Sequence, residues 1–469
     1  MTTGDWRIER DPLGEVRVAA TALYGAQTAR AAAWSFSGQV MPAALVHALG
    51  RIKAAAARVH GAAGRLPPAI ASAIERAARE VADGAHDGEF VVDVFQTGSA
   101  TSTNMNANEV IANRAAELLG AARGGNVVHP NDHVNLAQSS NDVMPSAVQL
   151  AAVTRGEQRL LPALAALVER LHALAGAHWS RVRDGRTHLM RAMPIRFGQQ
   201  FRGAAQHVAA ARRRLAAAID ECRALPLGGT AVGTGVNAPP GFAAAVCAAI
   251  RSESGVAVHE TEEHLAAQDC LDGLTALAAT MGTAATTLYK LVNDLRWQAS
   301  TAFEELVLPE LQPGSSQMPG KVNPVVCEAV LMVCAQVQGN AGVVAFANSQ
   351  GQFELNTMIP VVARNVLESI DLLAGAATTL RERCLDGLRL GDAPRQPVGG
   401  NPMLATALAP EIGYDAAAAI ARRAAHEHRS VLELAREMTG LDAAHLQQLL
   451  DPARLSGGPE QPPPSPPRR

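Results

Sequence analysis

The chain has 469 residues, 48% of them hydrophobic, and its 41 Lys and Arg against 44 Asp and Glu give a formal charge of −3. This length exceeds the size at which a single hydrophobic core stops growing, so we expect a large protein with several lobes. A near-neutral chain without local clusters of Lys and Arg lacks the cationic face that nucleic acid or an anionic membrane would need, so neither is expected as a partner.

The cysteines and the first residues bear on the compartment. The six cysteines are scattered without a C-x-x-C pair, so we expect reduced thiols rather than a disulfide framework or a zinc knuckle. Residues 1–11, MTTGDWRIERD, carry three acidic side chains and no apolar core, unlike a secretory or transit segment. These observations predict a cytoplasmic protein.

Composition divides the chain into four stretches, and the resulting fold class is all-α. Residues 1–140 mix helical stretches with polar loops and are predicted to form a mostly helical N-terminal domain. Residues 141–392 are predicted to form a central bundle of long helices. A linker rich in Pro and Gly leads into a small helical C-terminal domain at residues 393–455, and residues 456–469 are predicted to be a disordered Pro-rich tail.

Five proline-free segments with apolar residues at helical spacing define the predicted bundle: residues 163–193, 195–225, 241–308, 325–359 and 361–393. In one of them Leu265, Leu271, Leu274 and Leu277 begin a pattern that continues to Leu295, which predicts one long helix. Since aromatic residues make up only 3% of the chain, Ala, Leu and Val must fill the interior. Such rods seldom bury every apolar face within one chain, so we expect an oligomer.

The densest functional signal is GSSQMPGKVNP, residues 314–324, which combines two hydroxyls, a lysine and an asparagine with two glycines and two prolines. A loop of this kind can present backbone N–H groups and side-chain donors to an anion. The alternative is a surface turn with a serine that caps the following helix.

Three further polar clusters are candidate sites. TGSATSTNMNAN (97–108) precedes helical residues 109–119 and is either a carboxylate site at a helix start or a polar turn with an N-cap. HPNDHVNLAQSSN (129–141) has two histidines four residues apart, but Pro130 argues against a helical metal pair, so no metal site is predicted. In GRTHLMRAMP (185–194), His188 sits between two long helical segments and is either a proton donor or acceptor or a structural histidine.

Together these motifs resemble the aspartase/fumarase superfamily, and most closely the class II fumarate hydratases, from GEVRVAATALYGAQTAR (14–30) to EIGYDAAAAIARRA (411–424). The resemblance implies three domains, with a central five-helix bundle that forms a twenty-helix core in a homotetramer and active sites shared by three subunits. It also implies a hydro-lyase of the tricarboxylic acid cycle that reversibly hydrates the C4 dicarboxylate fumarate to L-malate, without metal or organic cofactor.

The same resemblance assigns roles to individual residues. Ser315 would be the base, His188 with Glu328 would supply a proton through a water, and the aci-carboxylate intermediate would be stabilised by Lys321 and Asn323. The substrate-binding residues would be Ser99, Thr101, Ser139, Ser140, Asn141 and Thr187. A second, non-catalytic anion site would consist of His129, Asn131 and Asp132. Aspartases usually carry glutamine at the position of the histidine, which favours water over ammonia as the leaving group.

The chain departs from the family pattern in three places. Ala100 stands where glycine is common, Arg191 stands where an acidic residue is common, and residues 300–303 read Ser-Thr-Ala-Phe in place of Ser-Gly-Pro-Arg. These changes bear on substrate choice. Two alternatives therefore stay open: a lyase of the same fold that acts on another C4 dicarboxylate or an amino acid, and a non-catalytic structural protein like the lens crystallins of the superfamily.

Overall fold

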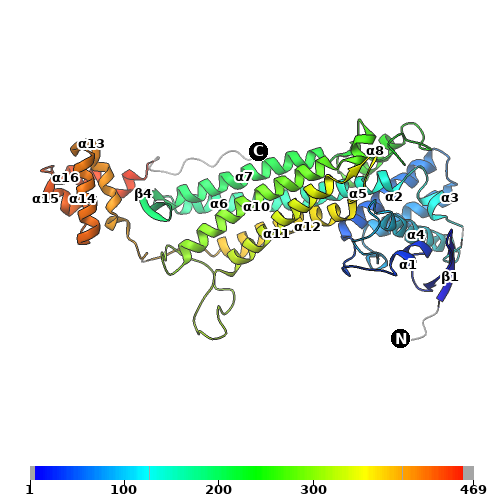
Figure 1. Ribbon diagram of the computed structural model, residues 1–469, viewed down its shortest axis with the longest axis horizontal. Helices are drawn as coiled ribbons and strands as arrows, with labels where there is room; N and C mark the ends of the chain where they lie inside the picture. The colour runs from blue at the N-terminus through cyan, green and yellow to red at the C-terminus, as the bar shows by residue number, and fades with distance from the viewer. Residues whose placement is uncertain (1–5, 126, 393, 458–469) are drawn as a thin grey trace. The chain divides into compact units, whose positions relative to one another are not determined.

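The structure is a computed structural model that describes residues 6–125, 127–392 and 394–457. Helices dominate it, and the predicted all-α class is confirmed (Figure 1). In these described ranges the strands form only two-stranded sheets. Beyond Gly457, the tail predicted to be disordered lies outside the described residues.

The chain divides into two compact units. Unit 1 consists of residues 1–162, 213–285 and 335–374, and unit 2 consists of residues 163–212, 286–334 and 375–469. This division differs from the three domains expected from the sequence, which stay a prediction.

Unit 1 begins with an antiparallel hairpin and continues as a group of shorter helices. The hairpin pairs β1 (Trp6–Asp11) with β2 (Gly14–Ala19). The helices are α1 (Ala26–Ala31), α2 (Ala43–Ala62), α3 (Pro68–Ala82), α4 (Thr101–Leu118), α5 (Ser140–Arg155), α8 (Phe242–Ser254) and α9 (His264–Asp269). Short helical turns lie at Asp87–Glu89, Pro130–Val134 and Gly156–Leu160. Two small sheets pair β5 (Ala224–Leu225) with β6 (His259–Glu260) and β8 (Gly351–Gln352) with β9 (Leu355–Asn356).

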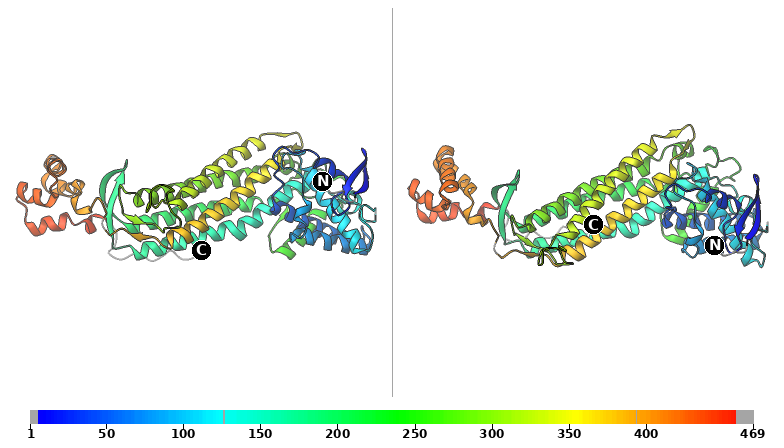
Figure 2. Two further views of the ribbon diagram at one scale, coloured as in Figure 1. Left: turned by 90° about the horizontal axis from the view of Figure 1, so that it is seen from below. Right: turned by 60° about the horizontal axis from the view of Figure 1, so that its bottom comes forward.

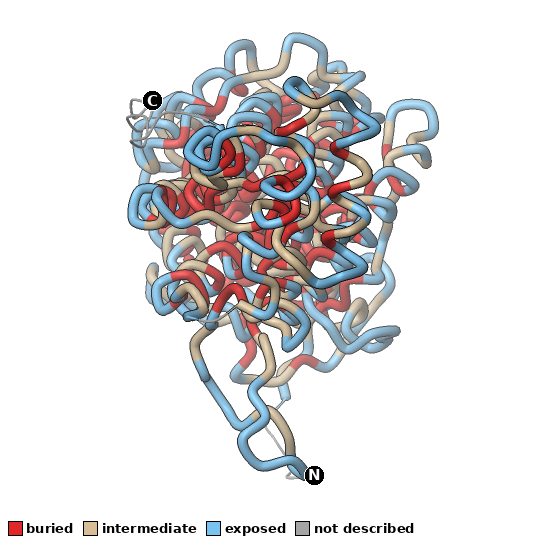
Figure 3. The backbone as a smooth tube through the Cα atoms, turned by 90° about the vertical axis from the view of Figure 1, so that its left-hand side faces the viewer, coloured by how far each residue is buried: buried red, intermediate tan, exposed pale blue. Residues whose placement is uncertain are grey.

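Five long helices occupy the middle of the chain: α6 (Leu161–Ala177), α7 (Phe197–Glu221), α10 (Asp272–Ala299), α11 (Val325–Asn348) and α12 (Ile359–Leu380). Within each unit their segments lie side by side (Figure 2). Their buried positions, coloured red in Figure 3, are mainly Ala, Leu and Val. Small side chains let the helices pack closely without large aromatic residues.

Three of the predicted helical segments are wrong in their extent. Residues 325–359 are not one helix, because α11 ends at Asn348 and the β8–β9 hairpin follows. Residues 163–193 are not one helix, because α6 ends at Ala177 and an antiparallel hairpin follows, β3 (Val182–Thr187) with β4 (Met190–Arg196). The absence of proline permits a helix but does not favour one. The segment that starts at Leu265 is interrupted at Cys270, whose backbone is extended (φ −122°, ψ 136°), so α9 and α10 are separate helices.

Unit 2 ends in the predicted small helical group, which has a core of its own. Leu404, Leu408, Ile420, Leu434 and Leu446 are buried in it. Its elements are the short helical turns Val398–Gly400 and Pro402–Leu408 and the helices α13 (Ala409–Ile412), α14 (Tyr414–Glu427), α15 (Val431–Met438), α16 (Ala443–Leu449) and α17 (Pro452–Leu455). Before it, a π-helical turn spans Arg381–Leu385 and β10 (Arg389–Leu390) pairs with β7 (Leu306–Val307).

Helix α11 is mostly apolar and has Glu328 as its one charged residue, and its exposed positions mix apolar side chains with Gln336 and Gln338. Met332 and Phe346 are 68% and 64% exposed. By length and composition alone, this helix and the helical stretch Ser140–Ala177 are each long and apolar enough to cross a membrane. In the single chain, α11 therefore exposes apolar surface of the kind that usually lies in an interface.

The substitution Gly50→Ala should lower the free energy of unfolding by about 1–3 kcal/mol, the usual penalty for overpacking. Gly50 in α2 faces α3 so closely that a Cβ atom there would lie 2.5 Å from the backbone nitrogen of Ala82. Urea unfolding at fixed protein concentration measures the change. Gly375→Ala in α12 is the matched control, because nothing lies within 4 Å of its Cβ position and alanine is the better helix former. Equal destabilisation by both substitutions would contradict the close contact.

Candidate active site

A chain of hydroxyl groups lies at the start of two helices in unit 1. Ser99 Oγ is 2.8 Å from Thr101 Oγ1, which is 2.7 Å from Ser140 Oγ. Thr101 and Ser140 are the first residues of α4 and α5. Since the first N–H groups of a helix have no partner within it, two helix N-termini and three hydroxyls can bind a carboxylate here.

Helix α4 starts earlier than the sequence suggested. Residues 101–108 belong to its first two turns, so the prediction that the polar cluster precedes the helix is wrong. Asn104, Asn106 and Asn108 are buried, and their tertiary contacts outweigh the modest helix propensity of asparagine. Ala100 precedes the helix in the left-handed conformation (φ 58°, ψ 24°), which explains why glycine suits this position better.

The start of α5 is fixed by a buried carboxylate. Ser139 and Asp142 form a capping box, in which the Ser139 N–H donates to Asp142 Oδ1 at 2.9 Å. The other oxygen, Oδ2, accepts the N–H groups of Gly228 and Thr230 at 2.9 and 3.0 Å. Burial raises the pKa of Asp142, while these N–H donors oppose the rise. Asp142 thus ties the serines at the helix start to the glycine-rich loop.

Asn141 shares this attachment, because its Nδ2 donates to the Ala231 carbonyl at 2.9 Å. Its side-chain oxygen lies 3.4 Å from Ser140 Oγ, which extends the hydroxyl chain by one polar group.

A cavity of about 610 Å³ in unit 1 adjoins the same helix start. Its lining includes Arg65, Asn131, Asp132, Ser139 and Asn237. His129 stands next to it, where its Nδ1 accepts the Asp132 N–H at 3.1 Å. The structure therefore brings together the three residues predicted to form the second anion site, with Arg65 as a nearby cation.

A buried lysine supports the wall of this cavity. Lys53 in α2 is fully buried, and its Nζ donates to Asn135 Oδ1 at 2.8 Å and to Gln138 Oε1 at 3.0 Å. Both acceptors line the cavity. Burial lowers the pKa of Lys53 to about 7, and the charge of Asp142 partly opposes that shift. Lys53 therefore changes charge close to neutral pH.

In unit 2, Thr187 and His188 lie at the tip of the β3–β4 hairpin. Along the chain His188 lies between two long helices, α6 and α7, as predicted, but it stands on a hairpin that turns in two residues, His188 (φ 54°) and Leu189 (φ 62°). Positive φ at both positions is the pattern of a type I′ hairpin turn, which normally selects Asn or Gly. A leucine in this conformation is strained by about 1–3 kcal/mol. The turn holds the imidazole exposed to solvent.

The loop of residues 314–324 has no regular secondary structure, as predicted, and extends away from the helices (Figure 1). The N–H groups of Gln317 and Met318 donate to Ser315 Oγ at 3.1 and 2.9 Å. Asn323 closes the base of the loop, because its Nδ2 donates to the Gly314 carbonyl at 2.6 Å. Two backbone dipoles are therefore directed at the hydroxyl that was predicted to be the base.

The other predicted catalytic side chains are His188, Lys321 and Glu328. Among the described residues of this single chain, the side chains of His188, Lys321 and Glu328 make no hydrogen bond or ion pair, and all three are exposed. The structure thus joins Ser99, Thr101 and Ser140 into one group and Ser315 with its N–H donors into another. It does not join His188 to Glu328 within the chain.

Sequence reasoning missed Lys53 and Asp142. Asp142 had a local signal, since serine followed three residues later by an acidic residue marks a capping box. Lys53 had none, because its partners lie 82 and 85 residues away in the chain.

Comparisons with known proteins cover nearly the whole chain. Residues 14–339 match the lyase family, and residues 404–457 match the fumarase C C-terminus. A class II fumarate hydratase of Xylella fastidiosa is 46% identical over 461 residues, which is 97% of this chain and 96% of that protein. One of Chromobacterium violaceum is 46% identical over 91% of this chain and 94% of its own length. The crystal structure of a class II fumarase from Schistosoma mansoni matches with a TM-score of 0.93 at 36% identity, covering 96% of this chain and 99% of that one.

The pKa of Lys53 predicts how stability changes with pH. In the unfolded chain its amine is protonated below about 10.5, but in the folded protein only below about 7. Between these values the unfolded state binds more protons, so the free energy of unfolding should rise with pH, by at most about 1.4 kcal/mol per pH unit. Urea unfolding at pH 7, 8 and 9 should show this rise in the free energy of unfolding for the wild type, and the contribution should be absent in Lys53→Met. Lys290→Met, which removes an exposed lysine, should keep it. Identical slopes in all three proteins would contradict the buried charge change.

Proposed function

The chain belongs to the class II fumarate hydratase family, and we propose that it catalyses the reversible hydration of fumarate to L-malate with Ser315 as the base. The observation that carries the mechanism is the environment of the Ser315 hydroxyl. Two N–H groups reach its oxygen, and Lys321 lies in the same loop. Both features lower the free energy of an alkoxide, which a serine in water could not form at neutral pH.

In the direction from malate to fumarate, the Ser315 oxygen takes a proton from the carbon beside a carboxylate. The electron pair moves into that carboxylate and produces an aci-carboxylate dianion. The main task is to stabilise this second negative charge with donors that are already in position. Lys321 and Asn323 are the proposed donors, since both belong to the loop that carries the base.

The hydroxyl then leaves the adjacent carbon with its bonding electrons and takes a proton, so that water is released. His188 is the proposed proton source through a water molecule, with Glu328 as its partner. The tip of the β3–β4 hairpin leaves this imidazole accessible to such a water molecule.

The proposed substrate-carboxylate ligands are the linked hydroxyl groups of Ser99, Thr101 and Ser140, together with Ser139, Asn141 and Thr187. Its 2.7–2.8 Å contacts support this role, because hydroxyls linked in this way can turn their hydrogens toward a bound oxygen anion. His129, Asn131 and Asp132 are the proposed second anion site, beside the cavity that Arg65 also lines.

We further propose a homotetramer in which three subunits build each site. Among the described residues, the side chains of His188, Lys321 and Glu328 are exposed and have no partner. This supports the arrangement, since catalytic groups of this kind need partners and exclusion of water. The exposed apolar side chains of α11 support it as well, because other copies of the helix would cover Met332 and Phe346. A cytoplasmic location remains a prediction from the sequence.

A substrate panel tests the activity. Purified protein incubated with L-malate should form fumarate, which absorbs in the ultraviolet, and should form none from L-aspartate. Fumarate from L-aspartate with L-malate inert would reassign the chain to carbon–nitrogen lyases. Inertness toward both, and toward substituted malates, would favour a structural protein.

Ser315→Ala should lower turnover by at least about 10²-fold, the contribution expected of a positioned base. Binding of succinate, which cannot undergo elimination, should survive, because other residues hold its carboxylates. Initial rates and isothermal titration measure the two effects. Ser316→Ala is the matched control, as it removes the neighbouring hydroxyl and should leave turnover within a few-fold of the wild type. Near-normal turnover in Ser315→Ala would move the base elsewhere.

A further inference from the structure

The hairpin that carries Thr187 and His188 needs support from outside its turn. The two turn residues, His188 and Leu189, both have positive φ. Leu189 is 59% exposed, so its side chain does little to hold the conformation. Backbone of this kind persists when the surrounding structure over-determines it. The contacts of the two strands are where that support lies.

The first support is a nearly buried ion pair next to the turn. Arg186 donates to Glu305 Oε1 at 2.7 Å, and the two side chains are 10% and 4% exposed. The Arg186 guanidinium carbon also lies 4.1 Å from the centre of the Phe303 ring, which places the cation against the aromatic face. Arg186 immediately precedes Thr187, so its position sets where the turn begins.

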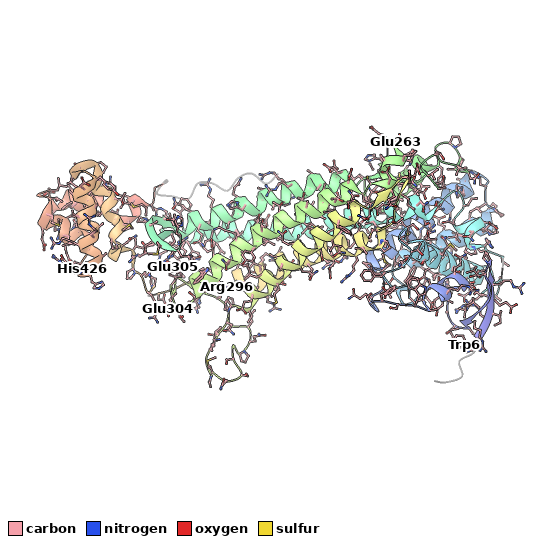
Figure 4. The ribbon with its side chains drawn as sticks, viewed as in Figure 1. Trp6, Glu263, Arg296, Glu304, Glu305 and His426 are labelled. Atoms are coloured by element: carbon pink, nitrogen blue, oxygen red, sulfur yellow. The ribbon has the colours of Figure 1, made fainter. Side chains whose placement is uncertain are left out.

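Glu305 is itself held from two directions. Its Oε2 accepts Gln298 Nε2 at 3.1 Å, and its N–H donates to the Gln298 carbonyl at 2.9 Å. Its carbonyl accepts the Gly391 N–H at 2.9 Å. Glu304 and Glu305 are consecutive residues in the segment that follows the end of α10 at Ala299 (Figure 4). The ion pair therefore ties the hairpin to a fixed part of unit 2.

A second ion pair joins the two strands of the hairpin to each other. Arg191 donates to Asp184 Oδ2 at 2.6 Å, and the Asp184 side chain is fully buried. Asn401 donates to Asp184 Oδ1 and to the Ala192 carbonyl, each at 2.8 Å. Together the two pairs restrain both strands within a few residues of His188.

Two of the three departures from the family pattern belong to these supports. Arg191 forms the second ion pair, and Phe303 supplies the ring under Arg186. Phe303, Arg186 and Thr187 also line one cavity of about 830 Å³ in unit 2, so the support lies directly beside a proposed substrate ligand.

We propose that Glu305 and Phe303 are positioning residues, which hold Arg186 and thereby fix Thr187 and His188 for catalysis; this inference rests on the proposed function. Glu305 faces Arg186 and is buried, whereas His188 is exposed, so Glu305 acts through the hairpin and not on the substrate. Displacement of a catalytic group by about 1 Å can lower a rate about 10²-fold.

Glu305→Gln tests the proposal, with Glu304→Gln as its matched control. Glu304 is the preceding residue and pairs with Arg395 at 3.1 Å on the surface. Glu305→Gln should lower kcat for L-malate about 10- to 100-fold per folded subunit with KM changed less than threefold. It should also speed hydrogen exchange in peptides covering residues 182–196. Glu304→Gln should leave kcat and the hydrogen exchange of residues 182–196 unchanged.

A second pair of variants covers the case in which Glu305→Gln does not fold. Phe303→Leu removes the ring and should lower kcat. Phe303→Tyr keeps the ring and should have a kcat close to that of the wild type. A purely structural role would change the folded fraction but not kcat per folded subunit.

Wild-type kcat and unchanged exchange in Glu305→Gln, or in Phe303→Leu if Glu305→Gln does not fold, would overturn the proposal. If the wild type turned over neither L-malate nor fumarate, the proposed function would fail on its own. Exchange in residues 182–196 would then decide the inference, since exchange equal to that of the wild type would overturn it.

Discussion

The two N–H groups directed at the Ser315 oxygen are the interaction on which the proposed chemistry depends. A hydroxyl removes a proton from carbon only if its surroundings stabilise the negative oxygen, and backbone donors supply that stabilisation without having to reorganise during the reaction. Their geometry depends on the folding of the loop, which Asn323 closes through the Gly314 carbonyl. A Cβ at Gly314 would lie 2.2 Å from the Lys321 carbonyl oxygen, so the closure requires glycine.

The same use of neutral donors recurs in unit 1. Ser99, Thr101 and Ser140 offer hydroxyls at two helix starts, where the helix dipoles already favour an anion. Neutral donors hold a carboxylate while leaving it able to accept further charge. Lys53 is fully buried nearby, and burial lowers its pKa to about 7. It lies behind Asn135 and Gln138, the two cavity-lining residues to which its amine donates.

The sequence predicted the helical class and the irregular loop at residues 314–324 because both depend on local composition. It failed where distant contacts decide the outcome. The β3–β4 hairpin was hidden because a stretch without proline can form either a helix or a hairpin. The outcome depends on the ion pair of Arg186 with Glu305 and on the hydrogen bond from Asn401 to Asp184, whose partners lie more than 100 residues apart in the chain. The start of α4 was misplaced because buried contacts of Asn104 and Asn108 with Asn135 outweigh their weak helix propensity. Within the described residues of the single chain, His188 is not joined to Glu328, and their convergence with Lys321 stays part of the proposed homotetramer.

The departures from the family pattern raised the question of whether substrate choice has changed. Each of them lies beside proposed substrate-binding residues without being one of them. Ala100 adopts a left-handed backbone that glycine would adopt more easily, Arg191 pairs with buried Asp184, and Phe303 packs against Arg186. None of the three belongs to the hydroxyl chain or to the Ser315 loop. Changes in such positions alter how firmly the ligands are held, and a change in the chemical class of the substrate would require changes among the ligands themselves. The departures are therefore compatible with a fumarate hydratase whose His188 hairpin is held by its own set of contacts.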